Sequence, residues 1–189
     1  MRSTDSFHAQ HSPIGAHASF TLGMFGANGG LALEKGSPGN QSVFVGYRSQ
    51  SGHTCLFPFF EQLVNDAERF SQEDEGDPSK TGSLVFEEEQ IKRAYSWGTD
   101  TFFAPGIEFS IRTPFDSIPD PDLADVDSLK RASCPASFLE LTIENTSDER
   151  WDGFFALQGD SPWTPLSQRG ELKGMITRDS MGFATSDPS

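Results

Sequence analysis

Apolar and polar residues alternate with a period of two along much of this chain, which is typical of β-strands with one buried face. Residues 16–22 show this alternation directly after a Ser-Pro-Ile-Gly turn signal at residues 12–15. A glycine-rich turn at residues 26–30 leads into a second short apolar strand at residues 31–33. We therefore predict a β-hairpin at the start of the chain, with histidines at its mouth.

The same alternation returns in several later segments that are separated by Gly, Pro, Asn and Asp residues. It predicts strands at residues 43–47 and 91–97 and hairpins at residues 101–112 and 139–157. In the second arm of the first of these hairpins, we expect the Ile and Phe side chains to face the core. The residues between them, Glu108, Ser110 and Arg112, are then expected to face solvent.

Residues 114–135 break the alternation and predict the one helix. Acidic residues at 120–122 offer a helix start, apolar residues recur every three positions from Leu123 to Leu129, and Lys130 and Arg131 close the segment. Acids early and bases late complement the helix dipole. A helix of about three turns suits a cover on a β framework. Residues 71–82 are charged and predict a surface excursion.

Composition supports a mainly β protein. The chain has 189 residues with 17 Phe, 18 Gly and 12 Pro, so its apolar content is aromatic and helical runs are interrupted often. This length suits one domain with a real core. We therefore predict a single domain over residues 1–189, built as an antiparallel β-sandwich with one short covering helix.

The net charge of the chain excludes several classes of binding partner. A formal net charge of −14 and a pI near 4.5 argue against nucleic acid or an anionic membrane as a partner. No apolar run approaches a membrane span, and the first residues contain no apolar leader, so we expect a cytoplasmic protein.

Cys55 and Cys134 lack metal-binding spacing, and two unpaired thiols are a better expectation than a disulfide.

The histidines are the first candidates for chemistry. His8 and His11 are three residues apart, and His17 and His53 lie elsewhere. A zinc site needs three or four converging donors, which this spacing does not provide. Ser12 beside His11 also lacks the arrangement of a catalytic pair. We expect neither a metal nor a cofactor, and we expect the histidines to hydrogen-bond the rim of the sheet or a sugar hydroxyl.

The three tryptophans are candidates for stacking on sugar rings. Trp163 lies in a proline-flanked segment, predicted to be a loop, and is the best candidate for an exposed platform. Trp97 and Trp151 lie in predicted strands, so we expect them to belong to the core.

Several segments together carry a family resemblance. They are residues 11–23, 29–34, 56–61, 99–101, 118–121, 135–146 and 154–155, in this order. The chain resembles the N-terminal region of glycoside hydrolase family 52, the β-xylosidases. The resemblance implies a β-sandwich that precedes an (α/α)6 barrel, and the barrel carries the catalytic Glu and Asp of a retaining mechanism. Neither catalytic position lies in this chain.

The resemblance leads to a specific expectation. The chain is a sandwich module that acts on xylo-oligosaccharides only together with a catalytic barrel. Its candidate residues near substrate are His11, Ser12 and Trp163, with His17 as a weaker candidate. The sequence ends where the family's sheet continues, so we expect an incomplete sheet edge that favours self-association or a dimer.

Two alternatives remain open on sequence alone. The chain is a small, self-sufficient β-xylosidase if two of Glu61, Asp100, Glu140 and Glu144 form a catalytic pair. It is a stand-alone carbohydrate-binding module if Trp163 forms a sugar platform.

Overall fold

The computed structural model describes residues 7–23, 27–33, 36, 39–61, 82–159, 162–166, 172–177 and 181–186. The chain divides into two compact units, residues 1–157 and residues 158–189. The surface excursion predicted at residues 71–82 lies outside the described residues, apart from Gly82. No helix in the described ranges has the length and apolar character needed to cross a membrane.

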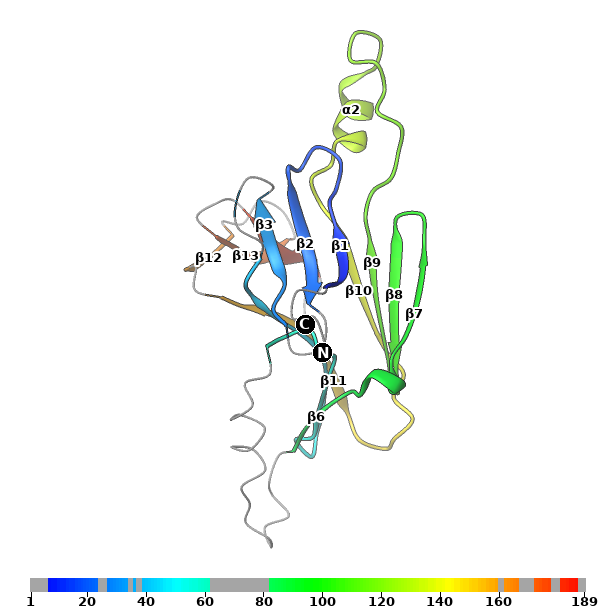
Figure 1. The fold of residues 1–189 in the computed structure, drawn as a ribbon, viewed down its shortest axis with the longest axis vertical. Helices are drawn as coiled ribbons and strands as arrows, with labels where there is room; N and C mark the ends of the chain where they lie inside the picture. Colours follow the sequence, from blue (N-terminus) through cyan, green and yellow to red (C-terminus); the bar gives the residue numbers. More distant parts are fainter. Residues whose placement is uncertain are drawn as a thin grey trace, which may run out of the picture. The chain divides into compact units, whose positions relative to one another are not determined.

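One antiparallel sheet of the first unit contains β7 (Lys92–Ser96), β8 (Thr99–Ala104), β9 (Ile107–Arg112) and β10 (Phe138–Ile143). Its strand order is β10-β9-β8-β7 (Figure 1). β8 and β9 form the predicted hairpin around Pro105 and Gly106. Gly106 has a φ of 75°, a value that glycine adopts without strain. A short 3-10 helix, η1 (Glu88–Gln90), precedes β7.

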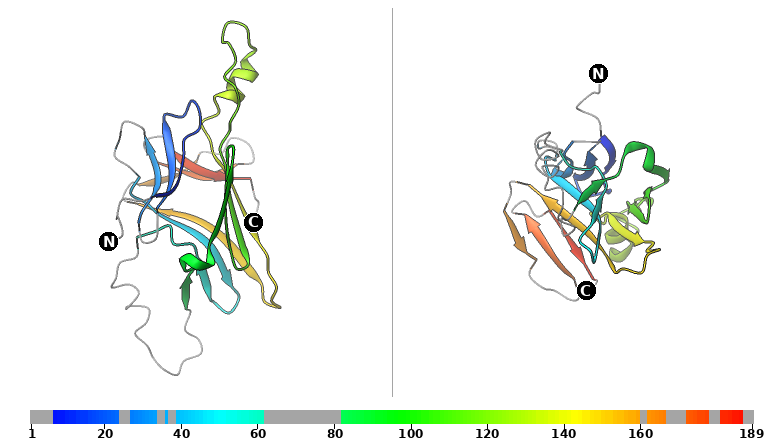
Figure 2. Two further views of the ribbon diagram at one scale, coloured as in Figure 1. Left: turned by 45° about the vertical axis from the view of Figure 1, so that its right-hand side comes forward. Right: turned by 90° about the horizontal axis from the view of Figure 1, so that it is seen from below.

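A second sheet contains β11 (Trp151–Gln158), β4 (Ser42–Ser49), β5 (Thr54–Leu56) and β6 (Ser83–Val85), in that order. β4 and β5 are antiparallel, whereas β5 and β6 are parallel. In Figure 2 the cyan strand β4 and the green strands of the first sheet lie in separate layers. The predicted strand at residues 43–47 belongs to this sheet. The prediction of a hairpin at residues 139–157 is wrong, because its first arm, β10, pairs with β9 in the first sheet and its second arm, β11, lies in this one.

A third sheet contains β1 (Phe7–His11), β2 (Ala18–Gly23) and β3 (Gly30–Leu33). β2 and β3 form the predicted hairpin, in which Phe20 pairs with Leu31. Phe20 and Leu22 are buried, as the alternation in this segment predicts. β1 pairs antiparallel with β2 and was not predicted, and it brings His11 to the edge of the sandwich.

The core of the first unit is aromatic and draws residues from all three sheets. The Phe57 ring stacks on Phe59 with the ring centroids 5.3 Å apart, and Phe59 meets Phe102 edge-on at 5.2 Å. These three side chains have no exposed surface. The fold is therefore a β-sandwich, with a single α-helix in the described part of the chain, and the predicted fold class is confirmed.

The helix, α2 (Val126–Ala132), starts later than the sequence suggests. The Asp125 side chain accepts hydrogen bonds from the backbone N–H groups of Asp127 and Ser128 and caps the helix, whereas Asp120 holds a turn through the N–H of Asp122. Only Ala132 of α2 is buried. The side chains of Leu123, before the helix, and Val126, at its start, are exposed.

The outward side of β9 also differs from the prediction. Glu108 is half-buried and Arg112 is exposed, but Ser110 is 4% exposed. The Ser110 hydroxyl lies 2.8 Å from the Thr101 hydroxyl on β8, so the two side chains satisfy each other across the outer face. The prediction that Ser110 faces solvent is wrong because a cross-strand partner covers it.

The second unit contains an antiparallel sheet of β12 (Trp163–Pro165), β13 (Lys173–Thr177) and β14 (Gly182–Thr185). The Trp163 ring meets the Phe183 ring edge-on across this sheet, with the centroids 5.6 Å apart. Trp163 therefore lies on a strand, and the prediction of a loop at this position is wrong. Cys55 and Cys134 are both unpaired, as expected.

Candidate functional site

A pocket of about 360 Å³ lies at the end of the sandwich where β1 approaches β7, β8 and the segment after β9. Its lining comes from the first unit alone. The residues that line it are Gln10, His11, Ser12, Ile14, Arg93, Tyr95, Ser96, Gly98, Thr99, Asp100, Thr113, Pro114 and Phe115.

Strand register explains why a carboxylate lies at the bottom of this pocket. Asp100 pairs with Tyr95 on β7 and with Ile111 on β9, and Ile111 pairs with Leu139 on β10. These four residues form one row across the core-facing side of the sheet. The next row on the same face contains Phe102. The pocket is thus the point where the apolar core face becomes polar.

Asp100 is held by a bidentate ion pair. Both Asp100 carboxylate oxygens accept hydrogen bonds from Arg93, from Nε and Nη2, each at 2.7 Å. The Asp100 side chain is 6% exposed and that of Arg93 is 38% exposed, so the pair runs from the interior to the pocket surface. The Arg93 guanidinium also lies 5.3 Å from the Phe102 ring centroid and 5.4 Å from that of Tyr95.

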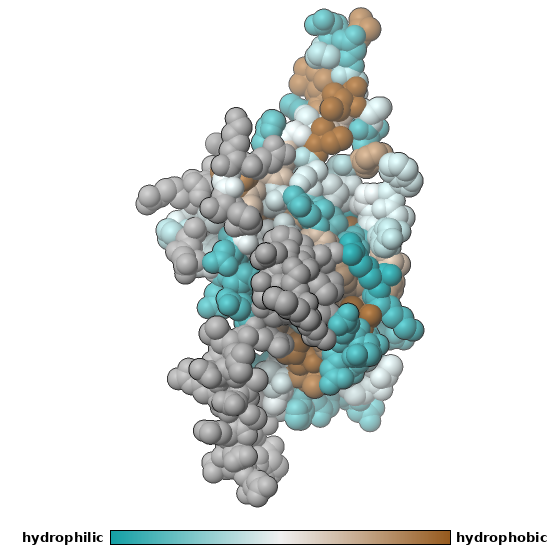
Figure 3. Space-filling view, in the orientation of Figure 1, coloured by the Kyte–Doolittle hydropathy of each residue, from teal (hydrophilic) through white to brown (hydrophobic). Residues whose placement is uncertain are grey.

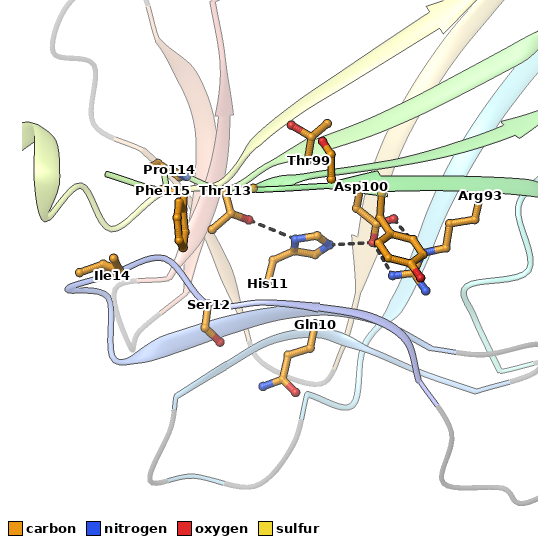
Figure 4. A pocket seen from close by; sticks show the side chains of 13 residues that line it. Gln10, His11, Ser12, Ile14, Arg93, Thr99, Asp100, Thr113, Pro114 and Phe115 are labelled. Carbon is orange, nitrogen blue, oxygen red and sulfur yellow. Dashed lines mark hydrogen bonds and ion pairs between the residues drawn. The ribbon is translucent and has the colours of Figure 1, made fainter. Parts of the chain in front are cut away.

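His11 connects the third sheet to this ion pair. Its Nδ1 lies 3.1 Å from the Thr113 hydroxyl and its Nε2 lies 3.5 Å from Asp100 Oδ2. Figure 4 shows the imidazole between these two partners, with Arg93 on the other side of Asp100. The Nε2 atom is fully buried, and among the described residues it has no partner closer than this carboxylate. The hydrogen-bonding capacity of His11 Nε2 is therefore only partly used.

The pKa of Asp100 is set by opposing effects. Burial raises it, but the nearby His11 imidazole and the hydrogen bonds and charge of Arg93 lower it by more. The net pKa lies below the ordinary range, so Asp100 stays ionised at neutral pH. In turn, the hydrogen bond that Arg93 donates to Asp100 raises the pKa of Arg93. The pair acts as a fixed, internally neutralised element and not as a proton donor.

Exposed aromatic side chains surround the polar floor. Tyr95 is 79% exposed and Phe115 is 65% exposed, and both line the pocket. Trp97 lies outside the lining but contacts Phe115, with ring centroids 5.2 Å apart, and is 84% exposed. The prediction that Trp97 belongs to the core is wrong because it occupies the turn between β7 and β8, beyond the end of the sheet. Trp151 stacks on Tyr47 and packs against the core, as predicted.

Two glycines shape the loops around the pocket. Gly98 has a φ of 66° in the turn after β7, and its backbone oxygen accepts a hydrogen bond from the Thr113 N–H at 2.7 Å. Gly15 has a φ of 85°, and a Cβ at this position would lie 2.8 Å from the backbone oxygen of Ser133. Gly15 therefore permits a close approach between the β1–β2 connection and the chain after α2.

The structure brings two of the predicted residues into the pocket. His11 and Ser12 both line it. His17 lies in the connection to β2, exposed and with a φ of 47°, and is not part of the lining. Trp163 belongs to the second unit. The role of all four near a substrate stays a prediction.

Sequence reasoning missed the β7 side of the site. Arg93 and Tyr95 were not proposed, although a turn at Trp97 and Gly98 places both on the face that carries Asp100. A tryptophan–glycine pair between two alternating segments was the available signal. Thr113 and Phe115 lie just after β9 and follow no pattern that would single them out.

Metal-binding residues do not gather in the described ranges. No group of three or more His, Cys, Asp and Glu side chains there is arranged to hold a metal ion. His53 is exposed beside β5, and the side chain of His8 lies outside the described residues. What the pocket offers is hydroxyl, amide and imidazole groups around an ion pair.

Comparison with known proteins identifies the family of this fold. The sequence model of glycosyl hydrolase family 52 matches residues 20–189. The chain belongs to this family. A Beta-xylosidase of Geobacillus stearothermophilus is 40% identical over 166 residues, which cover 85% of this chain and 24% of that protein. A second Beta-xylosidase of the same organism is 31% identical over 180 residues, which cover 89% of this chain and 29% of that protein.

The extent of these matches matters for the site. The chain spans about a quarter of the length of the curated relatives that it matches. The family match includes Arg93, Asp100 and Phe115 and begins after His11 and Ser12. The ion pair and part of the aromatic rim therefore lie within the residues that the family model matches.

Proposed function

We propose that this chain is the sandwich module of a β-xylosidase of family 52 and takes part in hydrolysing xylo-oligosaccharides only together with a catalytic barrel. The observation that carries the proposal is the 40% identity to a Beta-xylosidase of which the chain covers 24%. The relative's remaining length leaves room for a catalytic region with the required pair of carboxylates.

The positions of the acidic residues support a non-catalytic role. The pocket lining contains one carboxylate, Asp100, which Arg93 keeps ionised and occupied. Glu140 lies on the opposite face of the same sheet, where it pairs with Arg112 at 2.7 Å. Glycoside hydrolysis needs two carboxyl groups across one bond, roughly 5–9.5 Å apart. Two groups that face opposite sides of a sheet do not form such a pair.

The other two acids of the self-sufficient alternative lie elsewhere. Glu144 follows the end of β10 beside Gly106, at the end of the sheet opposite to Asp100. Glu61 is exposed, and its backbone N–H donates to Asn28. In the described part of the chain, no two of these four acidic residues (Glu61, Asp100, Glu140 and Glu144) therefore lie together in one pocket.

The experiment is an assay with a nitrophenyl β-xyloside. The 189-residue chain alone is expected to release no nitrophenol above background. The same chain, joined to the part of the Geobacillus stearothermophilus relative that follows the matched region, is expected to hydrolyse the substrate. Activity of the chain alone that Asp100→Asn or Glu140→Gln abolishes would contradict the proposal and favour the self-sufficient enzyme.

We also propose that the chain self-associates. Apolar side chains that a monomer would normally cover are exposed around α2, namely those of Ile118, Leu123 and Val126. Figure 3 shows this surface as brown side chains on the segment that carries α2. Sedimentation velocity is expected to show a dimer that the change Leu123→Ser weakens. A strictly monomeric chain at high concentration would contradict this second proposal.

A further inference from the structure

We propose that the pocket formed by β1, β7 and β8 binds one xylosyl unit of a neutral oligosaccharide, with Tyr95 and Phe115 as the aromatic walls and His11, Asp100 and Arg93 as the polar floor. The choice of xylose among neutral sugars rests on the proposed function, whereas the choice of a neutral sugar rests on the geometry.

The walls of the pocket favour a ligand with an apolar face. Tyr95 and Phe115 expose most of their surface at the rim, and Trp97 continues the aromatic surface from Phe115. Exposed aromatic rings beside a concave site need a reason, because each costs free energy in contact with water. A pyranose presents C–H groups on one face and hydroxyls around its edge, so it satisfies both the walls and the floor.

The floor of the pocket favours hydroxyl groups over charged groups. Arg93 and Asp100 neutralise each other, and a chain with a net charge of −14 repels anionic ligands. The buried His11 Nε2 lies 3.5 Å from Asp100 Oδ2, too far for a strong hydrogen bond. The groups that a ligand would meet around this buried contact are the neutral hydroxyls and the amide of the pocket lining, which suit sugar hydroxyls.

The size of the pocket limits the ligand to a small sugar. Ligand pockets usually measure about 300–1,000 Å³, and this one, at about 360 Å³, lies at the lower end. The hydroxyls of Ser12, Thr99 and Thr113 and the amide of Gln10 add neutral donors and acceptors around the opening. These groups fit the edge of one sugar ring and do not extend into a long groove.

The test measures binding of xylobiose to the full 189-residue chain by titration calorimetry and by ligand-observed NMR, with cellobiose as the comparison sugar. Saturable binding near 1 mM is expected, as for a single-sugar site. Tyr95→Ala and Phe115→Ala are expected to weaken it about tenfold through loss of stacking. Tyr95→Phe keeps the ring and is expected to bind as the unchanged chain does.

The matched control is Leu84→Ala, which removes an apolar side chain that is 55% exposed from β6, away from the pocket. It is expected to leave binding unchanged. Because the aromatic side chains are exposed, circular dichroism is expected to show all these variants folded.

Three results would overturn the proposal: no saturable binding of xylobiose, equal binding by the alanine variants and the unchanged chain, or tighter binding of cellobiose. If the alanine variants lose only association with a catalytic region and not sugar binding, the aromatic rim is a protein contact and the proposal fails. Sugar binding by a chain that never supports xyloside hydrolysis would instead contradict the proposed module and leave the pocket assignment standing.

Discussion

Phe102 and Asp100 lie two residues apart on β8, on the same face of the same sheet, and have opposite surroundings. Phe102 is enclosed by Phe57 and Phe59 from the facing layer and has no exposed surface. Asp100 is covered instead by an imidazole from β1 and a guanidinium from β7. The two side chains are buried to nearly the same extent, but apolar rings cover Phe102, whereas an imidazole and a charged guanidinium cover Asp100.

This difference shows that the sandwich is closed in two ways. In the middle of the face, aromatic rings from two sheets fill the space, which contributes stability in proportion to apolar area removed from water. At the end of the face, beside Asp100, polar side chains from β1 and β7 cover the sheet and leave a pocket. The same sheet face thus provides a core and a candidate binding site.

The largest effect on stability is expected from removing an aromatic side chain from the core. Phe102→Ala removes a fully buried ring and should lower the free energy of unfolding by about 3–5 kcal/mol. Phe103→Ala is the matched control, because Phe103 is adjacent on β8 but faces outward and is 38% exposed. Its cost should stay below about 1 kcal/mol. Chemical denaturation measures both, and equal costs would contradict the assignment of the two faces.

Arg93→Ala should have the next largest effect. It leaves the buried Asp100 carboxylate with only a distant imidazole, and should cost about 2 kcal/mol, less than for a fully buried pair because Arg93 is partly exposed. Lys92→Ala, at the neighbouring exposed position on β7, is the control and should change stability little. A stability loss no larger than that of the control would show that the ion pair does not close this end of the face.

Acidic pH should selectively remove the stability that the Asp100–Arg93 ion pair contributes. Because the pKa of folded Asp100 lies below its ordinary value of 3.8, its ion pair stabilises the fold above that pH, and this contribution is lost as pH falls through the folded pKa. Asp100→Asn should therefore lose less stability than the unchanged chain between neutral pH and acid. The control is Asp152→Asn, in an exposed pair with Arg150. Identical acid sensitivity of all three proteins would contradict the prediction.

The smallest effect is expected on the outer face. Arg112→Ala breaks an ion pair with Glu140 in which both side chains are more than half exposed, and should change stability by less than about 1 kcal/mol. Thermal unfolding in low and high salt is the measurement. A cost similar to that of Arg93→Ala would show that exposure does not distinguish the two ion pairs.

The sequence predicted those parts of the fold in which local pattern and final burial agree. The hairpins β2–β3 and β8–β9 were predicted because a period of two and a glycine turn coincide in each. Ser110 was assigned to the wrong environment because period-two reasoning assumes that one face is wet, and a hydroxyl partner on the next strand is not visible in a linear pattern.

The site was predicted only in part for a similar reason. His11 and Ser12 stood out as a polar cluster in one segment. Arg93, Asp100 and Thr113 are scattered over twenty residues and meet only through pairing of β7, β8 and β9. Trp97 was assigned to the core because it falls at the end of a predicted strand, whereas β7 ends at Ser96 and Trp97 lies in the exposed turn.

The pairing of β4 with β11 has a consequence for the order of folding. The Gln50 N–H donates to the Arg150 oxygen at 2.9 Å, across one hundred positions of sequence. Closing so long a loop costs more chain entropy than closing the two-residue turn of β8 and β9, so local hairpins form first and this pair forms late. During synthesis, one edge of β4 therefore stays unpaired until β11 has been made, and an unpaired strand edge favours aggregation.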